Sequence, residues 1–231
     1  MKKYFSYRKF TRKDMGIKMF EIFTFNGGGY AANTYVLSES ESGDAILFDP
    51  SCPPAEMENF FSANGMTLRY VVLTHAHYDH MLSLNETRAH FIGVPVLVGK
   101  GDESAFADAK INCAYLFGIP SVDFGVPDRT ITEGDELILG DQKVSVISTP
   151  GHTPGCCCFL AGDIMVTGDT LFENSIGRSD FIGGNINTLI ASLKRLMSLD
   201  KDYEIYPGHG PSSTLSRERK HNPFILQIIN R

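Results

Sequence analysis

Three histidines and one aspartate stand within six residues of one another: His75, His77, Asp79 and His80. They follow directly on the apolar run at residues 70–73, which is typical of a buried strand. Polar side chains at the end of a strand are well placed to bind or react, because the sheet behind them is rigid. The cluster therefore predicts a metal site to which other parts of the chain contribute ligands.

Three further donors have the same placement in the second half of the chain. His152, Asp169 and His209 each follow a predicted strand, behind a turn made of small or rigid residues. In a layered fold such strand ends can converge on one edge, so we expect these side chains to meet the first cluster. By contrast, His90 and His221 are isolated in the sequence, and we expect ordinary solvated or hydrogen-bonded side chains there.

The seven donors are more than one metal ion needs. Imidazole and carboxylate groups suit zinc, and also iron or manganese. A tetrahedral zinc ion takes four ligands, or three and a water when it is catalytic, so seven donors suit two ions that share a carboxylate. Two ions about 3.5–4 Å apart can hold a hydroxide and polarise the oxygen that it attacks. The pattern predicts hydrolysis of a carbonyl or phosphoryl centre.

The elements that must position these donors come in two runs, each of strands followed by helices. The first run has predicted strands at 19–25, 33–38, 44–48, 68–74 and 96–98, and helices at 54–64, 81–91 and, with interruptions, 101–118. The second has strands at 129–132, 136–139, 143–148, 156–160, 164–167 and 203–206, a loop at 170–185, and helices at 186–199 and 214–229, the last interrupted at Pro223. This order predicts an α+β fold with two packed sheets and helices outside.

Composition narrows the class of protein. The chain has 231 residues, 42% of them hydrophobic, and no linker-like stretch divides it, which indicates one large domain. The formal net charge of −6 argues against a primary nucleic-acid binder. No apolar run approaches the roughly 20 residues that a membrane span needs. We therefore predict neither nucleic acid nor membrane as a partner, only a small-molecule substrate.

The N-terminal residues and the cysteines give two further expectations. Residues 1–18 hold seven basic residues and one acidic residue, which predicts a basic extension outside a core domain at 19–231. The five cysteines include the run Cys156, Cys157 and Cys158 but no pair spaced as in a thiolate zinc site. We expect a reduced, cytoplasmic protein in which these thiols fill the core. The sequence carries no signal for an oligomeric state.

Four motifs together resemble the metallo-β-lactamase superfamily, and most closely its glyoxalase II-like (hydroxyacylglutathione hydrolase-like) branch in a short form. They are His-Ala-His-Tyr-Asp-His at 75–80, Thr-Pro-Gly-His-Thr-Pro-Gly at 149–155, Gly-Asp-Thr-Leu-Phe at 168–172 and Pro-Gly-His-Gly at 207–210. The likeness extends from about residue 19 to residue 223. It implies an αββα sandwich of two mixed sheets with helices on the outer faces and the metals at one edge.

The resemblance also implies how the donors divide between two divalent metal ions, with Zn²⁺ as the first expectation and iron or manganese as alternatives. The first ion would be bound by His75, His77 and His152. The second would be bound by Asp79, His80 and His209, with Asp169 as the bridge. Asp79 and Asp169 are then the candidate catalytic residues.

Three other residues near these motifs have two open roles each. Asp49 either supports the site or caps the turn before a proline, and Tyr78 either lines the pocket or packs on other aromatic rings. Arg178 lies in a Gly-Arg-x-Asp loop at 177–180 that resembles one in short glyoxalase II-like hydrolases. Its planar guanidinium either clamps a substrate carboxylate or pairs with Asp180 to brace the loop.

The function that the resemblance implies is hydrolysis of a small acyl substrate by a metal-bound hydroxide, with a thioester of the hydroxyacylglutathione type as the first candidate. The C-terminal helical domain that holds glutathione in glyoxalase II has no counterpart here, so glutathione recognition is open. One alternative is a persulfide dioxygenase, with a single iron on His75, His152 and Asp169. Another is a hydrolase of the same fold with a different substrate, such as a lactone.

Overall fold

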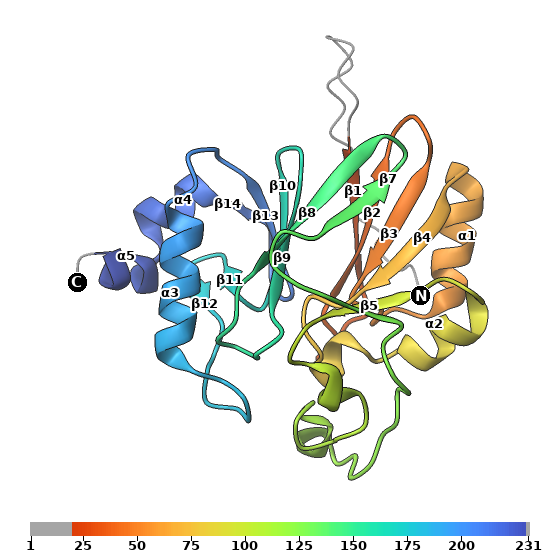
Figure 1. The fold of residues 1–231 in the computed structure, drawn as a ribbon, viewed down its shortest axis with the longest axis horizontal. Helices are drawn as coiled ribbons and strands as arrows, with labels where there is room; N and C mark the ends of the chain where they lie inside the picture. Colours follow the sequence, from red (N-terminus) through yellow and green to blue (C-terminus); the bar gives the residue numbers. More distant parts are fainter. Residues whose placement is uncertain (1–19, 230–231) are drawn as a thin grey trace.

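Two six-stranded β-sheets stand face to face in the middle of the molecule, and helices cover their outer sides (Figure 1). The computed structural model describes residues 20–229, so the predicted basic extension at 1–18 lies outside the described residues. Both sheets mix parallel and antiparallel pairs. This is the α+β arrangement predicted from the order of strands and helices.

The first sheet follows the chain without a crossover in its strand order. Its strands are β1 (Phe20–Asn26), β2 (Asn33–Glu39), β3 (Asp44–Phe48), β4 (Thr67–Val72), β5 (Val96–Gly99) and β6 (Arg129–Ile131). The parallel pairs begin at β3 and β4, whose connection runs through helix α1 (Pro54–Asn64). Helix α2 (Leu84–His90) lies between β4 and β5. Two short 3₁₀ helices follow strand ends, η1 (Tyr78–His80) after β4 and η2 (Glu103–Phe106) after β5, and a third, η3 (Ala114–Phe117), follows η2.

The second sheet has the strand order β14-β13-β10-β9-β8-β7. Its strands are β7 (Glu136–Leu139), β8 (Gln142–Ser148), β9 (Cys157–Ala161), β10 (Ile164–Gly168), β13 (Glu204–Pro207) and β14 (Ser213–Thr214). Helix α3 (Ile186–Met197) lies in the connection from β10 to its parallel neighbour β13. The last two elements of the described residues are α4 (Leu215–His221) and α5 (Pro223–Ile229). A small hairpin of β11 (Leu171–Phe172) and β12 (Ser175–Ile176) precedes α3.

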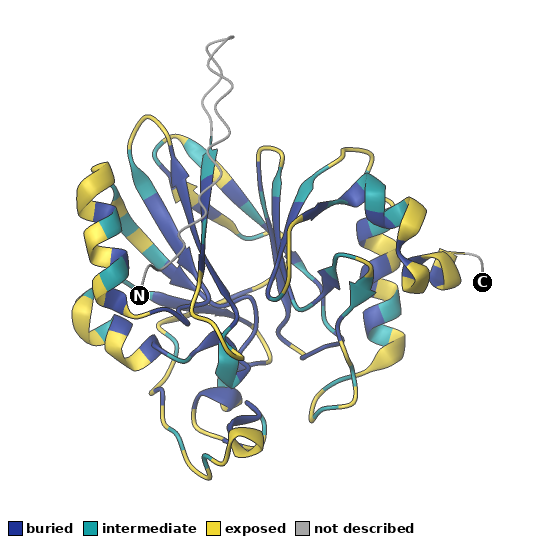
Figure 2. Cartoon of the chain, turned by 180° about the vertical axis from the view of Figure 1, so that it is seen from behind, coloured by how far each residue is buried: buried dark blue, intermediate teal, exposed yellow. Residues whose placement is uncertain are grey.

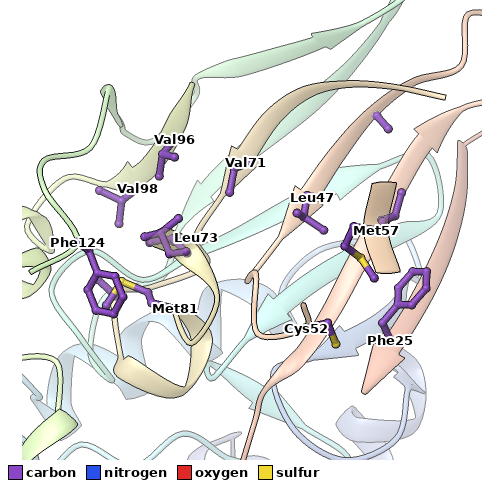
Figure 3. Packing of buried hydrophobic residues seen from close by; sticks show 14 of the residues in the cluster. Phe25, Leu47, Cys52, Met57, Val71, Leu73, Met81, Val96, Val98 and Phe124 are labelled. Atoms are coloured by element: carbon purple, nitrogen blue, oxygen red, sulfur yellow. The ribbon is translucent and has the colours of Figure 1, made fainter. Parts of the chain in front are cut away.

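Alternation along the strands supplies a separate apolar layer on each face of a sheet. In β3, Ile46 and Phe48 face the second sheet, where Phe48 meets Phe159 with ring centroids 4.9 Å apart. Leu47 points the other way, toward Met57 of α1 (Figure 3). Because β3 is covered on both faces, it reads as a continuous apolar run. Figure 2 shows the same division, with buried strands inside and exposed residues on the outer helices.

The third layer packs α3 and α5 on the outer face of the second sheet. Leu189, Leu193 and Leu196 lie on one side of α3 and are completely buried. The cysteine run divides between two layers, since Cys157 lies between the sheets and Cys158 faces the helices. All five cysteines are buried, which confirms the prediction that the thiols of the run at 156–158 fill the core.

Several predicted elements need correction. The helix predicted at 101–118 is two short 3₁₀ helices, because local side chains satisfy its backbone: Asp108 accepts from the amides of Lys110 and Ile111, and Asn112 from that of Ala114. The loop predicted at 170–185 contains the hairpin β11–β12, and β14 was not predicted. None of the helices within residues 20–229 has the length and apolar character of a membrane span.

Candidate metal centre

The structure brings all seven predicted donors together at one edge of the two sheets. Strands β8, β10 and β13 of the second sheet run in the same direction, and their carboxyl ends deliver the donors of the second half. Strand β4 of the first sheet delivers the cluster at 75–80. Three groups of donor atoms are close enough to hold a metal ion: His75, His77 and His152; His75, His80 and Asp169; and Asp79, His80 and His209.

The first group consists of three buried imidazoles whose nitrogens face one another. Nε2 of His75 lies 3.1 Å from Nδ1 of His77 and 3.2 Å from Nε2 of His152. Burial lowers the pKa of His77 to about 3 and that of His75 well below its ordinary value, and neighbouring histidines add to both shifts. The two rings are therefore neutral near pH 7, which is the form that binds a metal. This donor chemistry fits a metal ion.

Backbone and hydroxyl partners fix how two of these rings are turned. Nδ1 of His152 donates to the carbonyl oxygen of Arg178 over 2.7 Å, so its Nε2 points at the other rings. Nδ1 of His75 lies 3.2 Å from the hydroxyl of Thr74. A hydrogen bond on one ring nitrogen selects the tautomer whose other nitrogen is free to bind a metal.

The group of Asp79, His80 and His209 shares no residue with the first group and is more open to solvent. Nε2 of His209 lies 3.0 Å from Oδ2 of Asp79, and the side chain of His209 is 39% exposed. Nε2 of His80 is buried 3.3 Å from Oδ1 of Asp169, and neither atom has a hydrogen-bond partner among the described residues. Buried polar atoms without partners are uncommon in native proteins, and a metal ion here would satisfy both.

Asp169 lies between the group that contains His152 and the group that contains His209. Its Oδ2 atom is 3.6 Å from Nε2 of His152 and 3.8 Å from Nε2 of His209. Burial alone would raise the pKa of this carboxyl, but His80, His152 and His209 hold it below its usual range. The carboxyl is therefore ionised and can face both groups at once.

Asp49 supports the site from behind. Its backbone is left-handed with φ of 49°, and its Oδ1 and Oδ2 atoms accept from the amide and the hydroxyl of Thr74, each over 2.8 Å. Oδ2 also lies 2.9 Å from Nδ1 of His80, which turns Nε2 of that ring toward the donors. The sequence left open whether Asp49 supports the site or caps a turn. Its contact with His80 favours the supporting role.

Asp102 is a supporting residue that the sequence did not reveal. It is almost completely buried after β5, where it accepts from the amides of Ala76 and Gly155 over 3.0 and 2.7 Å and from the hydroxyl of Thr153 over 2.8 Å. It thus ties the loop that carries His75 and His77 to the loop that carries His152. Its place just past a predicted strand was the only signal in the sequence.

Arg178 and Tyr78 lie near the donors but have other partners. The guanidinium of Arg178 forms two hydrogen bonds of 2.7 Å with Asp180 and lies 3.8 Å from the centroid of the Phe181 ring. Tyr78 packs beside Phe117, with ring centroids 5.6 Å apart. His90 is not part of the site, since it pairs with Glu58 on the surface.

Comparison with known proteins identifies the class of this molecule. A family model described as the metallo-β-lactamase superfamily matches residues 27–209. This chain belongs to that superfamily, as the four sequence motifs indicated.

The curated relatives are of similar length to this chain. A probable metallo-hydrolase, YqgX of Bacillus subtilis (strain 168), is 32% identical over 201 residues, which cover 86% of this chain and 94% of the relative. The hydroxyacylglutathione hydrolase GloC of Haemophilus influenzae is 32% identical over 200 residues, covering 85% and 93%. The chain is therefore a member of a group of metallo-hydrolases.

Solved structures show the same fold. The B3 metallo-β-lactamase BLEG-1 matches with a TM-score of 0.81 and 30% identity, over 88% of this chain and 99% of that one. TTHA1623, solved in a di-iron-bound form, matches with a TM-score of 0.76 and 32% identity, over 87% and 99%. ETHE1 from Myxococcus xanthus matches with a TM-score of 0.71 and 25% identity, over 90% of each chain.

Proposed function

We propose that this protein is a dinuclear metallohydrolase that cleaves a small acyl substrate, with a thioester of the hydroxyacylglutathione type as the first candidate. The observation that carries the proposal is the presence of two disjoint groups of three donors with the ionised Asp169 between them. One group alone would suffice for a mononuclear centre. The second group, in which the buried Nε2 of His80 makes no hydrogen bond among the described residues, is the reason for assigning a second ion.

In this proposal each residue has a defined task. His75, His77 and His152 hold one ion, and Asp79, His80 and His209 hold the other. Ions bound there would lower the pKa of a coordinated water and polarise the substrate carbonyl. The side chain of Asp79 is 19% exposed against 12% for Asp169, so Asp79 is the carboxylate placed to orient a water that enters from solvent. Asp169 is more deeply buried and would be the carboxylate shared by the two groups.

The metal and the acyl group are assigned from separate observations. The five imidazoles favour zinc, and the di-iron form of TTHA1623 shows that a similar chain can hold iron. The name of GloC supports a glutathione thioester. The pairing of Arg178 with Asp180 weighs against Arg178 as a clamp for a glutathione carboxylate. We place the protein in the cytoplasm because the cysteines form no disulfide among the described residues.

The test combines metal analysis with a substrate panel. Protein purified without chelator should contain two metal ions per chain and hydrolyse one or more thioesters from a panel that also includes a lactone and a phosphodiester. One iron per chain with oxygen uptake on glutathione persulfide would instead establish the dioxygenase alternative on His75, His152 and Asp169.

The bridging role of Asp169 has its own test. Asp169→Ala should lose both ions and the hydrolytic activity, because both groups lose a shared charge. Asp163→Ala, on the exposed β9–β10 turn, is the matched control and should retain both. A full metal complement with unchanged activity in Asp169→Ala would refute the bridge.

A further inference from the structure

Three aromatic side chains from separate segments meet beside the candidate metal centre. Tyr30 comes from the loop between β1 and β2, Tyr78 from η1, and Phe117 from η3. The Phe117 ring centroid lies 4.4 Å from that of Tyr30 and 5.6 Å from that of Tyr78. We call these three residues the aromatic wall.

The aromatic wall remains accessible to solvent. Tyr30 is 53% exposed and Phe117 is 37% exposed, although their rings are in contact. The adjacent Leu116 is also half exposed. Scattered exposed apolar residues are ordinary, but a cluster of aromatic rings at the mouth of a polar site is typical of ligand-binding surfaces.

Backbone hydrogen bonds fasten the aromatic wall to the metal-binding motif. The amide of Tyr78, which stands between His77 and Asp79 in the chain, donates to the carbonyl of Asn112 over 2.7 Å, just before η3. The amide of Ala32, two residues after Tyr30, donates to the carbonyl of Asp79 over 3.2 Å. The segment 101–125, yellow-green to green in Figure 1, forms a lobe below the lower edge of the sheets. These hydrogen bonds connect the segments that carry the wall to the segment that carries the donors.

Cys113 shows where η3 stands relative to the site. Burial and, to a lesser extent, the Asp79 carboxylate raise the pKa of this thiol, the Arg178 guanidinium lowers it, and the net value is about 11. The residue that precedes η3 thus lies within electrostatic reach of a proposed metal ligand on one side and of the 177–180 loop on the other. The aromatic wall, which includes Tyr78 between His77 and Asp79 in the chain, therefore adjoins the segment that carries these proposed ligands.

The charges at this approach favour an uncharged substrate group. The guanidinium of Arg178 donates both of its side-chain hydrogen bonds shown here to Asp180. Its positive charge is therefore already paired with a carboxylate. Tyr30, Tyr78 and Phe117 offer no cationic group to a substrate anion. Aromatic rings contribute apolar area and edge or face contacts to a bound group. A substrate carboxylate would meet no comparable partner on this wall.

We propose that the aromatic wall binds an apolar, uncharged part of the substrate, such as an aryl or branched alkyl acyl group, while the scissile carbonyl faces the metal centre. The proposal rests on the proposed hydrolytic function, because it assigns the selectivity of that same site. It makes Tyr30 and Phe117 specificity-determining residues.

The experiment uses two thioesters with the same thiol, one phenylacetyl and one acetyl, together with their non-hydrolysable amide analogues. The metal-loaded protein should hydrolyse the phenylacetyl thioester with a kcat/KM about tenfold above that of the acetyl thioester. Phe117→Ala should lower kcat/KM for the phenylacetyl thioester by about tenfold and so remove this preference. Phe224→Ala, an exposed phenylalanine on α5, is the matched control and should leave both rates unchanged.

Binding of the amides, measured by calorimetry, separates this proposal from the proposed function. Tighter binding of the phenylacetyl amide that disappears in Phe117→Ala supports the wall even where no thioester is hydrolysed, and that failure would count against the hydrolase alone. Equal binding of the two amides by the unchanged protein would overturn the wall. An equal loss on both thioesters in Phe117→Ala, with the metal content preserved, would overturn it as well.

Discussion

Oδ2 of Asp49 lies 2.9 Å from Nδ1 of His80, and both side chains are completely buried. The contact joins the end of β3 to the metal-binding motif after β4. A carboxylate on one ring nitrogen fixes the tautomer and the orientation of the other nitrogen, which here points at Asp169. Asp49 thus prepares His80 for a metal ion without being a ligand itself.

Asp49→Asn should lower the metal affinity of the group that contains His80 by about 10–100-fold. Asparagine tolerates the left-handed backbone of this position, but its amide offers no second acceptor for Thr74 and His80. Titration with a competing chelator should show one weakened ion per chain and one unchanged ion. Asp163→Asn provides the control at an exposed aspartate, and equal affinities in the two variants would contradict the role of Asp49.

Gly208 gives a second prediction, because a Cβ atom there would lie 2.1 Å from Oδ1 of Asp169 and 2.6 Å from Cε1 of His80. Gly208→Ala must displace both side chains and should abolish binding of at least one ion, as measured by metal content. Gly210 is the matched control: its φ of +77° is strained for alanine, but no atom lies within 4 Å of the added Cβ. Gly210→Ala should cost about 1 kcal/mol of stability and retain both ions. Full metal content in Gly208→Ala would show that the site accommodates the methyl group.

Asp102→Ala should weaken both the fold and the metal centre. The change leaves two buried amides and one hydroxyl without their acceptor. We expect a loss of about 3 kcal/mol in the free energy of unfolding and a metal affinity lower by about tenfold or more. Urea unfolding and chelator titration measure the two effects. Asp108→Ala is the control from the same segment, since Asp108 caps an exposed turn, and a variant at Asp102 that behaved like it would refute the supporting role.

Glu218 provides a prediction of pH dependence. Burial tends to raise the pKa of this carboxyl, but contacts with Ser213, the amide of Asn174, Asn222 and Arg217 lower it overall. A carboxyl with a depressed folded pKa stabilises the protein above its unfolded pKa, and that stability is lost as the pH falls through the folded pKa. At pH 7, Glu218→Gln should therefore be less stable by about 1–3 kcal/mol, and the difference should shrink below about pH 4.5.

Urea unfolding across pH 3–7 checks this prediction. Glu136→Gln is the control, because Glu136 pairs with Lys143 on the surface and its loss should cost less than about 0.5 kcal/mol. A difference between Glu218→Gln and the unchanged protein that stays constant down to pH 3 would show that the carboxylate charge is not what holds α4 in place.

The seven donors were predictable because each lies close in sequence to a recognisable strand. The strands that end at Ser148, Gly168 and Pro207 are each followed by a donor one to four residues later. Small and rigid residues at these strand ends indicate the turns. The two-sheet architecture followed from the same strands. The local sequence pattern was sufficient to predict a donor wherever the strand before it could be recognised.

Asp102 was not predictable for the opposite reason. Its partners Ala76, Thr153 and Gly155 are 26, 51 and 53 residues away, and its place just past a predicted strand does not by itself indicate these contacts. The segment around it has the apolar spacing of a helix, yet Asp108 and Asn112 bond to the backbone and leave only short turns. Periodicity does not register this competition between side chain and backbone.

Each of the three candidate metal-binding groups takes side chains from both halves of the chain. A ribosome that has synthesised the first sheet has therefore made no complete group. The first triad becomes complete only when His152 is added, and the Asp79–His80–His209 triad only after another 57 residues, when His209 follows. The order of the residues thus leaves every group incomplete until part of the second sheet has been synthesised, and it completes the first triad before the second.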